Sequence, residues 1–274
     1  MKLYVDSRFR TADSPSSSDF TIELLEAIEL PRSCKVRVWN MCVPFSWYTV
    51  EADVNQYLYL SEKDVNNVQS YRSFALPAGQ YDGPKLATAI ADGLNTGSQY
   101  TSGATPTPYT VRYSDQRGTI SIAVSAPLQP FTLYSDLALR EMSSWPFSGA
   151  SRYQLKSFNR NLRIEGAETY NIARPFASEF VDLLTQKALY LTSTSLGNLS
   201  NVGPAPGQRD VLIMVPVTSS YGYLVVDSGA ENWQDTDCSG QLLKRISFQL
   251  RDATGSIVPL HGLEFCFVLS LDTA

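Results

Sequence analysis

The dominant pattern along the chain is an alternation of apolar and polar residues, which is typical of strands with one buried face. In residues 19–24 it places Phe20, Ile22 and Leu24 on one side of a sheet. In residues 35–43 it places Val36 and Val38 together, with Asn40 as a further candidate for the same face. The runs with this alternation are 2–6, 19–24, 35–43, 56–60, 109–113, 119–124, 187–192, 211–215, 221–226, 247–250, 257–260 and 264–269. So many short strands, separated by Pro, Gly, Asn and Ser, predict an all-β sandwich or barrel.

Turn and helix signals interrupt this pattern at a few places. Residues 114–118 and 252–255 each end in a glycine, which supplies the left-handed residue of a tight β-turn. Residues 84–94 have apolar residues at near-helical spacing, with Asp82 placed as the N-cap, and they predict one helix packed on a sheet. Residues 178–184 fit either a short helix or a turn that leads into the next strand.

No linker or repeat divides the sequence, so we expect one domain over residues 1–274. We expect its core to draw on both chain ends, near Phe20, Val36, Leu189, Ile213, Leu224, Phe248 and Phe267. Residues 72–140 are the expected position of a small inserted module. Two polar segments, 11–18 and 193–208, have no period and are expected to be exposed connections.

Composition narrows the possible functions. Hydrophobic residues make up 43% of the 274 residues, enough to bury a core, and this excludes intrinsic disorder. The formal charge of −5 is the opposite of the charge expected from a protein that coats nucleic acid. Only 18% of residues are charged, whereas about 25% is typical of soluble domains. We therefore expect a largely uncharged surface, suited to lasting contact with neighbouring molecules.

The sequence predicts neither a membrane-spanning helix nor a secretory signal. The longest apolar runs are far shorter than the roughly 20 residues that a transmembrane helix needs. The first residues do not resemble a secretory signal, so synthesis in the cytoplasm is expected.

Candidate chemistry is sparse. The chain has a single histidine, His261, and any Ser-His-Asp, Cys-His or histidine-based metal site would have to include it. It precedes Gly262 in an expected turn, so we interpret it as an ordinary loop residue. The carboxylates Asp235 and Asp237 lie close in sequence, but acid–base hydrolysis needs two carboxylates across a cleft, and a sequence does not show that separation.

The cysteines also lack a pattern typical of catalysis or metal binding. Cys34, Cys42, Cys238 and Cys266 have neither C-x-x-C spacing nor nearby histidines, so we interpret them as ordinary thiols, with Cys42 and Cys266 inside apolar strands. The sequence thus predicts no catalytic, cofactor-binding or metal-binding residues, no cofactor and no enzyme activity.

Tryptophans offer a sugar-binding alternative, because their rings can act as stacking platforms. The four are Trp39, Trp47, Trp145 and Trp233. Trp39 and Trp47 lie in or beside strand patterns, whereas Trp233 has a polar setting that is typical of a loop tip. We favour packing or contact with a neighbouring subunit over sugar binding.

A series of motifs also resembles a known family. The chain opens with Tyr-Val-Asp-Ser-Arg at 4–8, followed by 18–24 and by a strand that runs into 43–49. A Gly-x-Tyr turn at 79–81 precedes the expected helix and a hairpin. The end has Phe-Gln-Leu-Arg-Asp-Ala-Thr-Gly at 248–255 and Phe-Cys-Phe-Val-Leu at 265–269. In this order the motifs resemble the penton, or minor capsid, proteins of Polinton-like viruses, virophages and related double-stranded DNA viruses.

The resemblance implies an all-β, jelly-roll β-sandwich with an inserted small module that contains one short helix and a hairpin. It also implies a structural virion protein that forms homopentamers at the fivefold vertices of an icosahedral capsid. Its partners would be trimers of a double-jelly-roll major capsid protein, without direct nucleic-acid binding. The alternatives are a receptor- or glycan-binding β-sandwich of a vertex spike or tail fibre, and an enzyme on a jelly-roll scaffold. Oligomeric state distinguishes a capsid vertex protein from a spike or fibre head, because the vertex protein is expected to be a pentamer and fibre heads are usually trimers.

Overall fold

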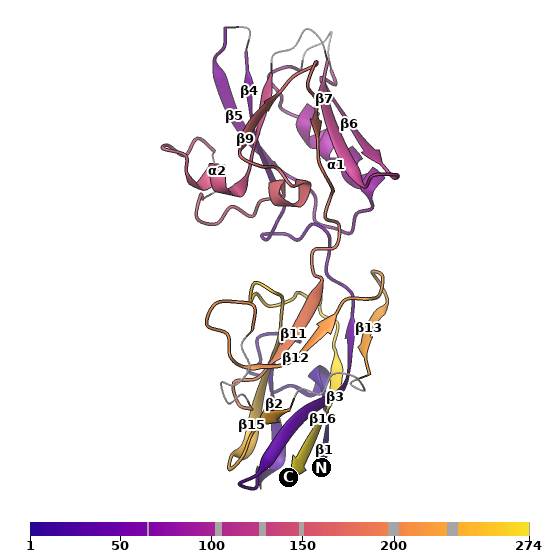
Figure 1. Cartoon of the computed structure of the whole chain (residues 1–274), viewed down its shortest axis with the longest axis vertical. Helices are drawn as coiled ribbons and strands as arrows, with labels where there is room; N and C mark the ends of the chain where they lie inside the picture. The colour runs from indigo at the N-terminus through magenta and orange to yellow at the C-terminus, as the bar shows by residue number, and fades with distance from the viewer. Residues whose placement is uncertain are drawn as a thin grey trace. The chain divides into compact units, whose positions relative to one another are not determined.

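Both ends of the chain fold into one β-sandwich, and the middle of the chain forms a second unit (Figure 1). The computed structural model describes residues 1–64, 66–101, 106–125, 130–147, 151–196, 203–228 and 235–273. Unit 1 consists of Met1–Trp47 and Gln186–Ala274, and unit 2 is Tyr48–Thr185. Unit 2 is therefore a continuous insertion between the two parts of the sandwich.

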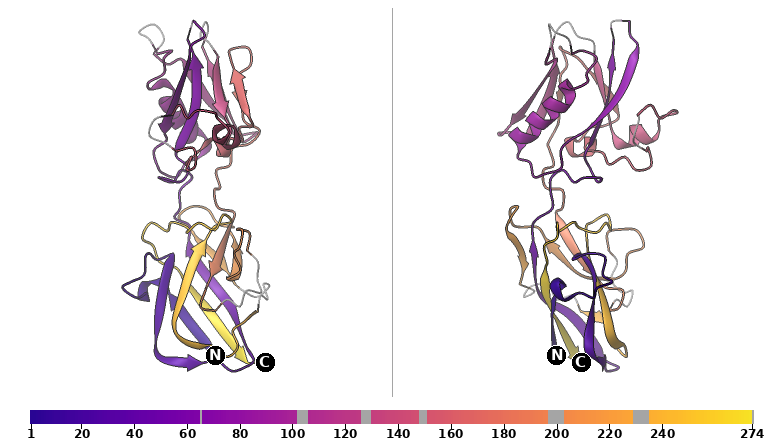
Figure 2. Two further views of the ribbon diagram at one scale, coloured as in Figure 1. Left: turned by 90° about the vertical axis from the view of Figure 1, so that its left-hand side faces the viewer. Right: turned by 180° about the vertical axis from the view of Figure 1, so that it is seen from behind.

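Unit 1 contains two antiparallel sheets, each built from both parts of the chain (Figures 1 and 2). The first sheet has the order β1 (Lys2–Asp6), β16 (Cys266–Thr273), β3 (Cys34–Pro44) and β13 (Leu224–Asp227), and β14 (Thr236–Asp237) also pairs with β3. The second has the order β12 (Val211–Pro216), β11 (Ala188–Thr192), β15 (Leu242–Arg251) and β2 (Asp19–Glu29). A short 3₁₀ helix, η1 (Ser7–Phe9), follows β1. The expected all-β jelly-roll fold is confirmed.

The alternating residues of these strands form the core of unit 1. Phe20 of β2 and Phe248 of β15 have ring centroids 5.6 Å apart, and Phe248 lies 4.9 Å from Phe267 of β16. This contact joins the two sheets through edge-to-face packing of aromatic rings. The burial pattern of β2 weakens at Leu24, which is half-buried, beside a register shift between Leu243 and Arg245 of β15.

Unit 2 contains two further sheets and a helix. One sheet has the order β5 (Gln69–Ala75), β4 (Tyr57–Lys63), β8 (Phe131–Tyr134) and β9 (Ala167–Tyr170). The other has the order β10 (Phe176–Ala177), β7 (Thr119–Val124) and β6 (Tyr109–Ser114). The helical segments are α1 (Gly83–Asn95), α2 (Asp136–Arg140) and η2 (Asn159–Leu162). Leu86, Ile90 and Leu94 of α1 are buried in a core shared with strands of both sheets.

The inserted part is larger than the small module expected over residues 72–140. Unit 2 extends over 48–185 and includes seven strands among its described residues. The difference arises because β4 and β9, which lie outside 72–140, both pair with β8, which lies inside it. The alternation in residues 56–60 predicted a strand but did not show which sheet it would join.

Most of the local predictions agree with the structure. Helix α1 begins after Asp82, whose side chain accepts a hydrogen bond from the backbone N–H of Lys85. Gly118 and Gly255 have positive φ angles and close the two predicted turns. Residues 178–184 form no helix, which leaves the other alternative, a connection that leads into the next strand. One segment differs: residues 257–260 form only a bridge at Ile257.

Candidate assembly surface

The first sheet of unit 1 has an outer face on which apolar side chains are aligned across strands. Tyr4 of β1 lies opposite Val268 of β16, and Cys42 of β3 lies between Cys266 and Val226. Each of these residues has at least one sequence neighbour buried in the sandwich core, so these side chains point outward. Exposed fractions are 76% for Tyr4 and 56% for Val226. The face is thus apolar where an exposed sheet face would ordinarily be polar.

Trp39 lies on this outer face, at a β-bulge that shifts the alternation of the residues after it. In the pairing of β16 with β3, Val268 lies opposite Asn40 and Leu269 lies opposite Val38, which leaves Trp39 as an extra residue. The indole is 47% exposed, and the Nζ of Lys2 lies 4.4 Å from its ring centroid. Trp39 points outward as the alternation from Val36 and Val38 predicts, but the bulge keeps Asn40 on the same outer side, whereas the sequence alternation made Asn40 a candidate for the core face.

Charged side chains lie at the margin of the apolar area. Arg37 contacts the carboxylate of Asp235 at 2.7 Å, and Lys35 contacts the same carboxylate at 3.6 Å. At another margin, the Arg8 guanidinium donates to Asp6 at 2.6 Å and lowers the pKa of that carboxyl group. An apolar centre with a charged rim is the usual composition of a surface that contacts another protein.

Exposed apolar residues continue along β13 and the turn before it. Leu224 pairs with Pro44 at the end of β3 and is more than half exposed, so its placement in the core was wrong: its neighbour Val225 points inward and is buried instead. Tyr223 is also largely exposed, while its backbone carbonyl accepts a hydrogen bond from the N–H of Phe45. These residues extend the apolar area from β1 to β13. We call the apolar residues that point outward from this sheet and from the turn before β13 the outer face; they are the exposed Tyr4, Trp39, Tyr223, Leu224 and Val226 and the half-buried Val268.

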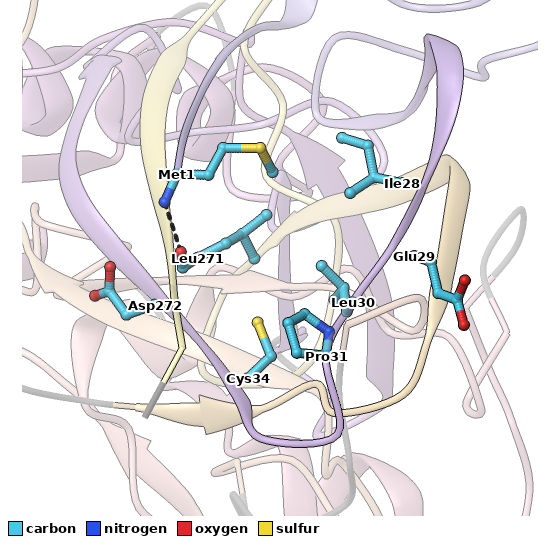
Figure 3. Close-up of a pocket in the computed structure, with 8 residues that line it drawn as sticks. All are labelled: Met1, Ile28, Glu29, Leu30, Pro31, Cys34, Leu271 and Asp272. Atoms are coloured by element: carbon cyan, nitrogen blue, oxygen red, sulfur yellow. Dashed lines mark hydrogen bonds between the residues drawn. The ribbon is translucent and has the colours of Figure 1, made fainter.

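A hollow of about 320 Å³ lies at one end of the sandwich, where the N-terminus meets the last strand (Figure 3). The Met1 α-amino group donates a hydrogen bond to the Leu271 carbonyl at 2.7 Å. The lining residues are Met1, Ile28, Glu29, Leu30, Pro31, Cys34, Leu271 and Asp272. Because apolar side chains predominate among them, the hollow fits contact with an apolar group better than acid–base chemistry.

The sequence and the fold can be compared with those of known proteins. No protein-family model matches the sequence, and no curated protein matches it at a significant level. A solved structure, that of the selenomethionine-labelled mavirus penton protein, matches with a TM-score of 0.54 and 9% sequence identity over 100% of both chains. The chain has a penton-like fold. Because the match spans the whole chain, the penton-like architecture includes unit 2 as well as the sandwich.

His261 is a turn residue in this penton-like fold. Its φ of 50° lies in the left-handed region, and its Nδ1–H donates a hydrogen bond to the Ser46 carbonyl at 2.7 Å. The ring thus joins the last turn of unit 1 to the chain segment that leaves β3. This is the structural role expected for a loop histidine.

Other candidate residues from the sequence lie apart from one another. Trp47 is buried and stacks on Phe45 with ring centroids 4.2 Å apart, whereas Trp145 packs on Phe147 in unit 2. Trp233 lies outside the described residues. Trp39 is the one exposed tryptophan in the described part of the chain, and it belongs to the outer face.

The carboxylates Asp235 and Asp237 serve local structure. Asp235 binds Arg37 and Lys35, as described above. Asp237 accepts hydrogen bonds from the N–H and hydroxyl of Ser239, and these lower its pKa. Among the described residues, no group of three or more His, Cys, Asp or Glu side chains is placed to hold a metal ion.

The helices described are also too short or too polar to cross a membrane.

The outer face as a whole was not predicted from the sequence. The alternation marks which residues leave the core, but the face depends on strands β1, β3, β13 and β16 lying side by side and on the bulge at Trp39. The low share of charged residues was the available signal, and it indicated a contact surface without locating it.

Proposed function

We propose that this protein is a structural virion protein, the penton subunit that occupies the fivefold vertices of an icosahedral capsid. The observation that carries the proposal is the penton-like fold over the whole chain. The apolar outer face adds independent support, because a vertex subunit needs surfaces that stay in contact with neighbours. In this role the protein acts by assembly, without catalysis.

Burial of the outer face supplies a physical reason for assembly. A large apolar side chain contributes about 1.5–3 kcal/mol when it moves from water into a packed interface. Tyr4 and Trp39 are exposed in the isolated chain, so most of this free energy of burial is still to be gained when a neighbouring subunit covers them. A head-to-tail contact that uses such a face closes into a ring when the rotation between subunits permits. We propose that the ring is a homopentamer held among trimers of a double-jelly-roll major capsid protein.

Native mass spectrometry of the purified chain tests the oligomeric state. We expect most of the protein to be pentameric at micromolar concentration. A trimer would favour the receptor- or glycan-binding alternative. If the chain stays monomeric alone, co-expression with the major capsid protein decides: incorporation at vertices supports the proposal, and absence from assembled shells refutes it.

A matched pair of variants tests the outer face. Tyr4→Ser removes an exposed ring from this face, and Tyr153→Ser removes a ring of similar exposure, 80%, from unit 2. We expect Tyr4→Ser to weaken pentamer formation at least tenfold, which corresponds to about 1.4 kcal/mol, and Tyr153→Ser to leave it nearly unchanged. Equal effects would contradict the assignment of the interface to the outer face.

A further inference from the structure

The four cysteines, which are far apart in sequence, lie in two cross-strand pairs on β3. Cys42 is the direct antiparallel partner of Cys266 in β16. Cys34, at the start of β3, accepts a backbone hydrogen bond of 3.0 Å from Cys238, which directly follows β14. All four are free thiols. The topology thus brings each cysteine next to one other cysteine.

The two pairs differ in their access to solvent. Cys34 and Cys238 are buried, with exposed fractions of 2% and 0%. Cys42 is half-buried and Cys266 is exposed. In their row of the outer face, Cys266 lies between Cys42 and Asp6, and Val226 follows Cys42. A dissolved reagent therefore reaches Cys266 and Cys42 before it reaches the other pair.

The strand register also sets the distance between the accessible cysteines. Direct partners in an antiparallel pair have Cα atoms about 4.5–5.5 Å apart, and disulfides span about 4.4–6.8 Å between Cα atoms. Both side chains leave the sheet on the same face, because direct partners share a face. A bridge between them can therefore form without separating or shifting the two strands.

We propose that Cys42 and Cys266 are a redox-active dithiol that closes into a disulfide by exchange with a small-molecule disulfide such as oxidised glutathione. A thiolate of the pair attacks the glutathione disulfide, forms a mixed disulfide and releases one glutathione. The second thiol loses its proton and displaces the other glutathione from the mixed disulfide. Two thiols are oxidised, one glutathione disulfide is reduced, and both thiol protons end on the two glutathione molecules.

The surroundings of Cys266 determine how fast this exchange proceeds. Burial and the neighbouring Cys42 raise the pKa of Cys266; the Asp6 carboxylate acts in the same direction, and the Arg8 guanidinium opposes it. The thiolate is the attacking species, so exchange is slow at neutral pH. The measurement is therefore made at about pH 8.5, where more thiolate is present.

Closure would join β3 to β16 covalently and enclose a loop that includes all of unit 2. Disulfides stabilise chiefly by restricting the unfolded chain, and the restriction grows with loop length. We expect the melting temperature of the sandwich to rise by about 5–10 °C on closure. The protein would then be more stable in oxidising surroundings than in the reducing cytoplasm. This inference does not depend on the proposed capsid role.

The experiment treats the purified full chain with oxidised glutathione, at a dilution where native mass spectrometry finds it monomeric so that the outer face is accessible, and then maps its peptides after alkylation of the remaining thiols. We expect a peptide pair linked through Cys42 and Cys266, together with the increase in melting temperature. Cys266→Ser is expected to lose the increase and to carry glutathione on Cys42 at most. The double variant Cys34→Ser/Cys238→Ser is the control, and it should retain the linked peptide.

Two results would overturn the inference. One is alkylation of both Cys42 and Cys266 after prolonged exposure to oxidised glutathione, which would show that the pair does not close. The other is a stable glutathione adduct on Cys266 with Cys42 still free. Because the peptide map is made on the wild-type chain, the outcome stands even if a serine variant fails to fold.

Discussion

Replacement of Glu62 tests whether a buried ion pair holds unit 2 together. Glu62 in β4 is 1% exposed, and its Oε1 accepts hydrogen bonds from Arg72 at 3.0 Å, Ser98 at 2.8 Å and Tyr109 at 2.8 Å. Burial, and next the Glu62 carboxylate, raise the pKa of Tyr109, so its hydroxyl stays protonated and donates. The carboxylate thus links β4, β5, β6 and the segment after α1.

Arg72 extends this network to the end of helix α1. Besides Glu62, its guanidinium donates to the carbonyls of Gly93, Leu94 and Thr96, which lie at the C-terminus of the helix. The last carbonyls of a helix have no partner within the helix and carry partial negative charge, so a guanidinium there is favourable. Loss of Glu62 would leave this cation with the helix carbonyls alone.

We expect Glu62→Gln to lower the free energy of unfolding of unit 2 by about 3 kcal/mol. Removal of one member of a buried ion pair costs about 3–5 kcal/mol, because the remaining charge is left buried without compensation. The lower end applies because the glutamine amide still occupies the site and Arg72 keeps its carbonyl partners. Urea unfolding, followed by the fluorescence of Trp145 in unit 2 and by circular dichroism, measures the change.

Glu168→Gln is the matched control. Glu168 pairs with Arg174 at the same distance of 3.0 Å, but the two side chains are 44% and 69% exposed. An exposed pair contributes about 0–1 kcal/mol. If Glu62→Gln destabilises unit 2 no more than Glu168→Gln, the network around Glu62 does not support the unit and our reasoning is wrong.

Three further changes test other parts of the structure. Phe248→Ala empties the contact between the two sheets of unit 1 and should cost about 3–5 kcal/mol in chemical denaturation; a loss below 1 kcal/mol would contradict its central place. Gly118→Ala forces a side chain into a φ of +63° and places its Cβ 2.6 Å from Phe180 Cε2, so we expect thermal unfolding to show a loss of about 1–2 kcal/mol. Asp82 has a pKa lowered first by its hydrogen bond from Lys85 N–H, so its stabilisation of α1 is present above the unfolded pKa of about 3.9 and is lost as pH falls through the folded value. Asp82→Asn should remove that part of the acid sensitivity, and an unchanged pH profile of unfolding would refute it.

The sequence by itself determined the local structure of this protein. Strand β2, helix α1 and the turns at Gly118 and Gly255 were all predicted, because alternation, N-capping and positive φ depend on residues within a few positions of one another. The same local signals indicated the all-β class.

Only the tertiary structure decided which strands are neighbours. The 56–60 strand joined unit 2 because it pairs with β5 and β8, so the insertion grew beyond 72–140. Asn40 lies on the outer face and not in the core because β3 has an extra residue opposite β16, and no local sequence pattern predicts such a bulge. The partnership of Cys42 with Cys266 has the same origin. Strand pairing joins residues that are far apart along the chain, and its register is selected by packing of the whole sheet, so these features appear only once the chain is folded.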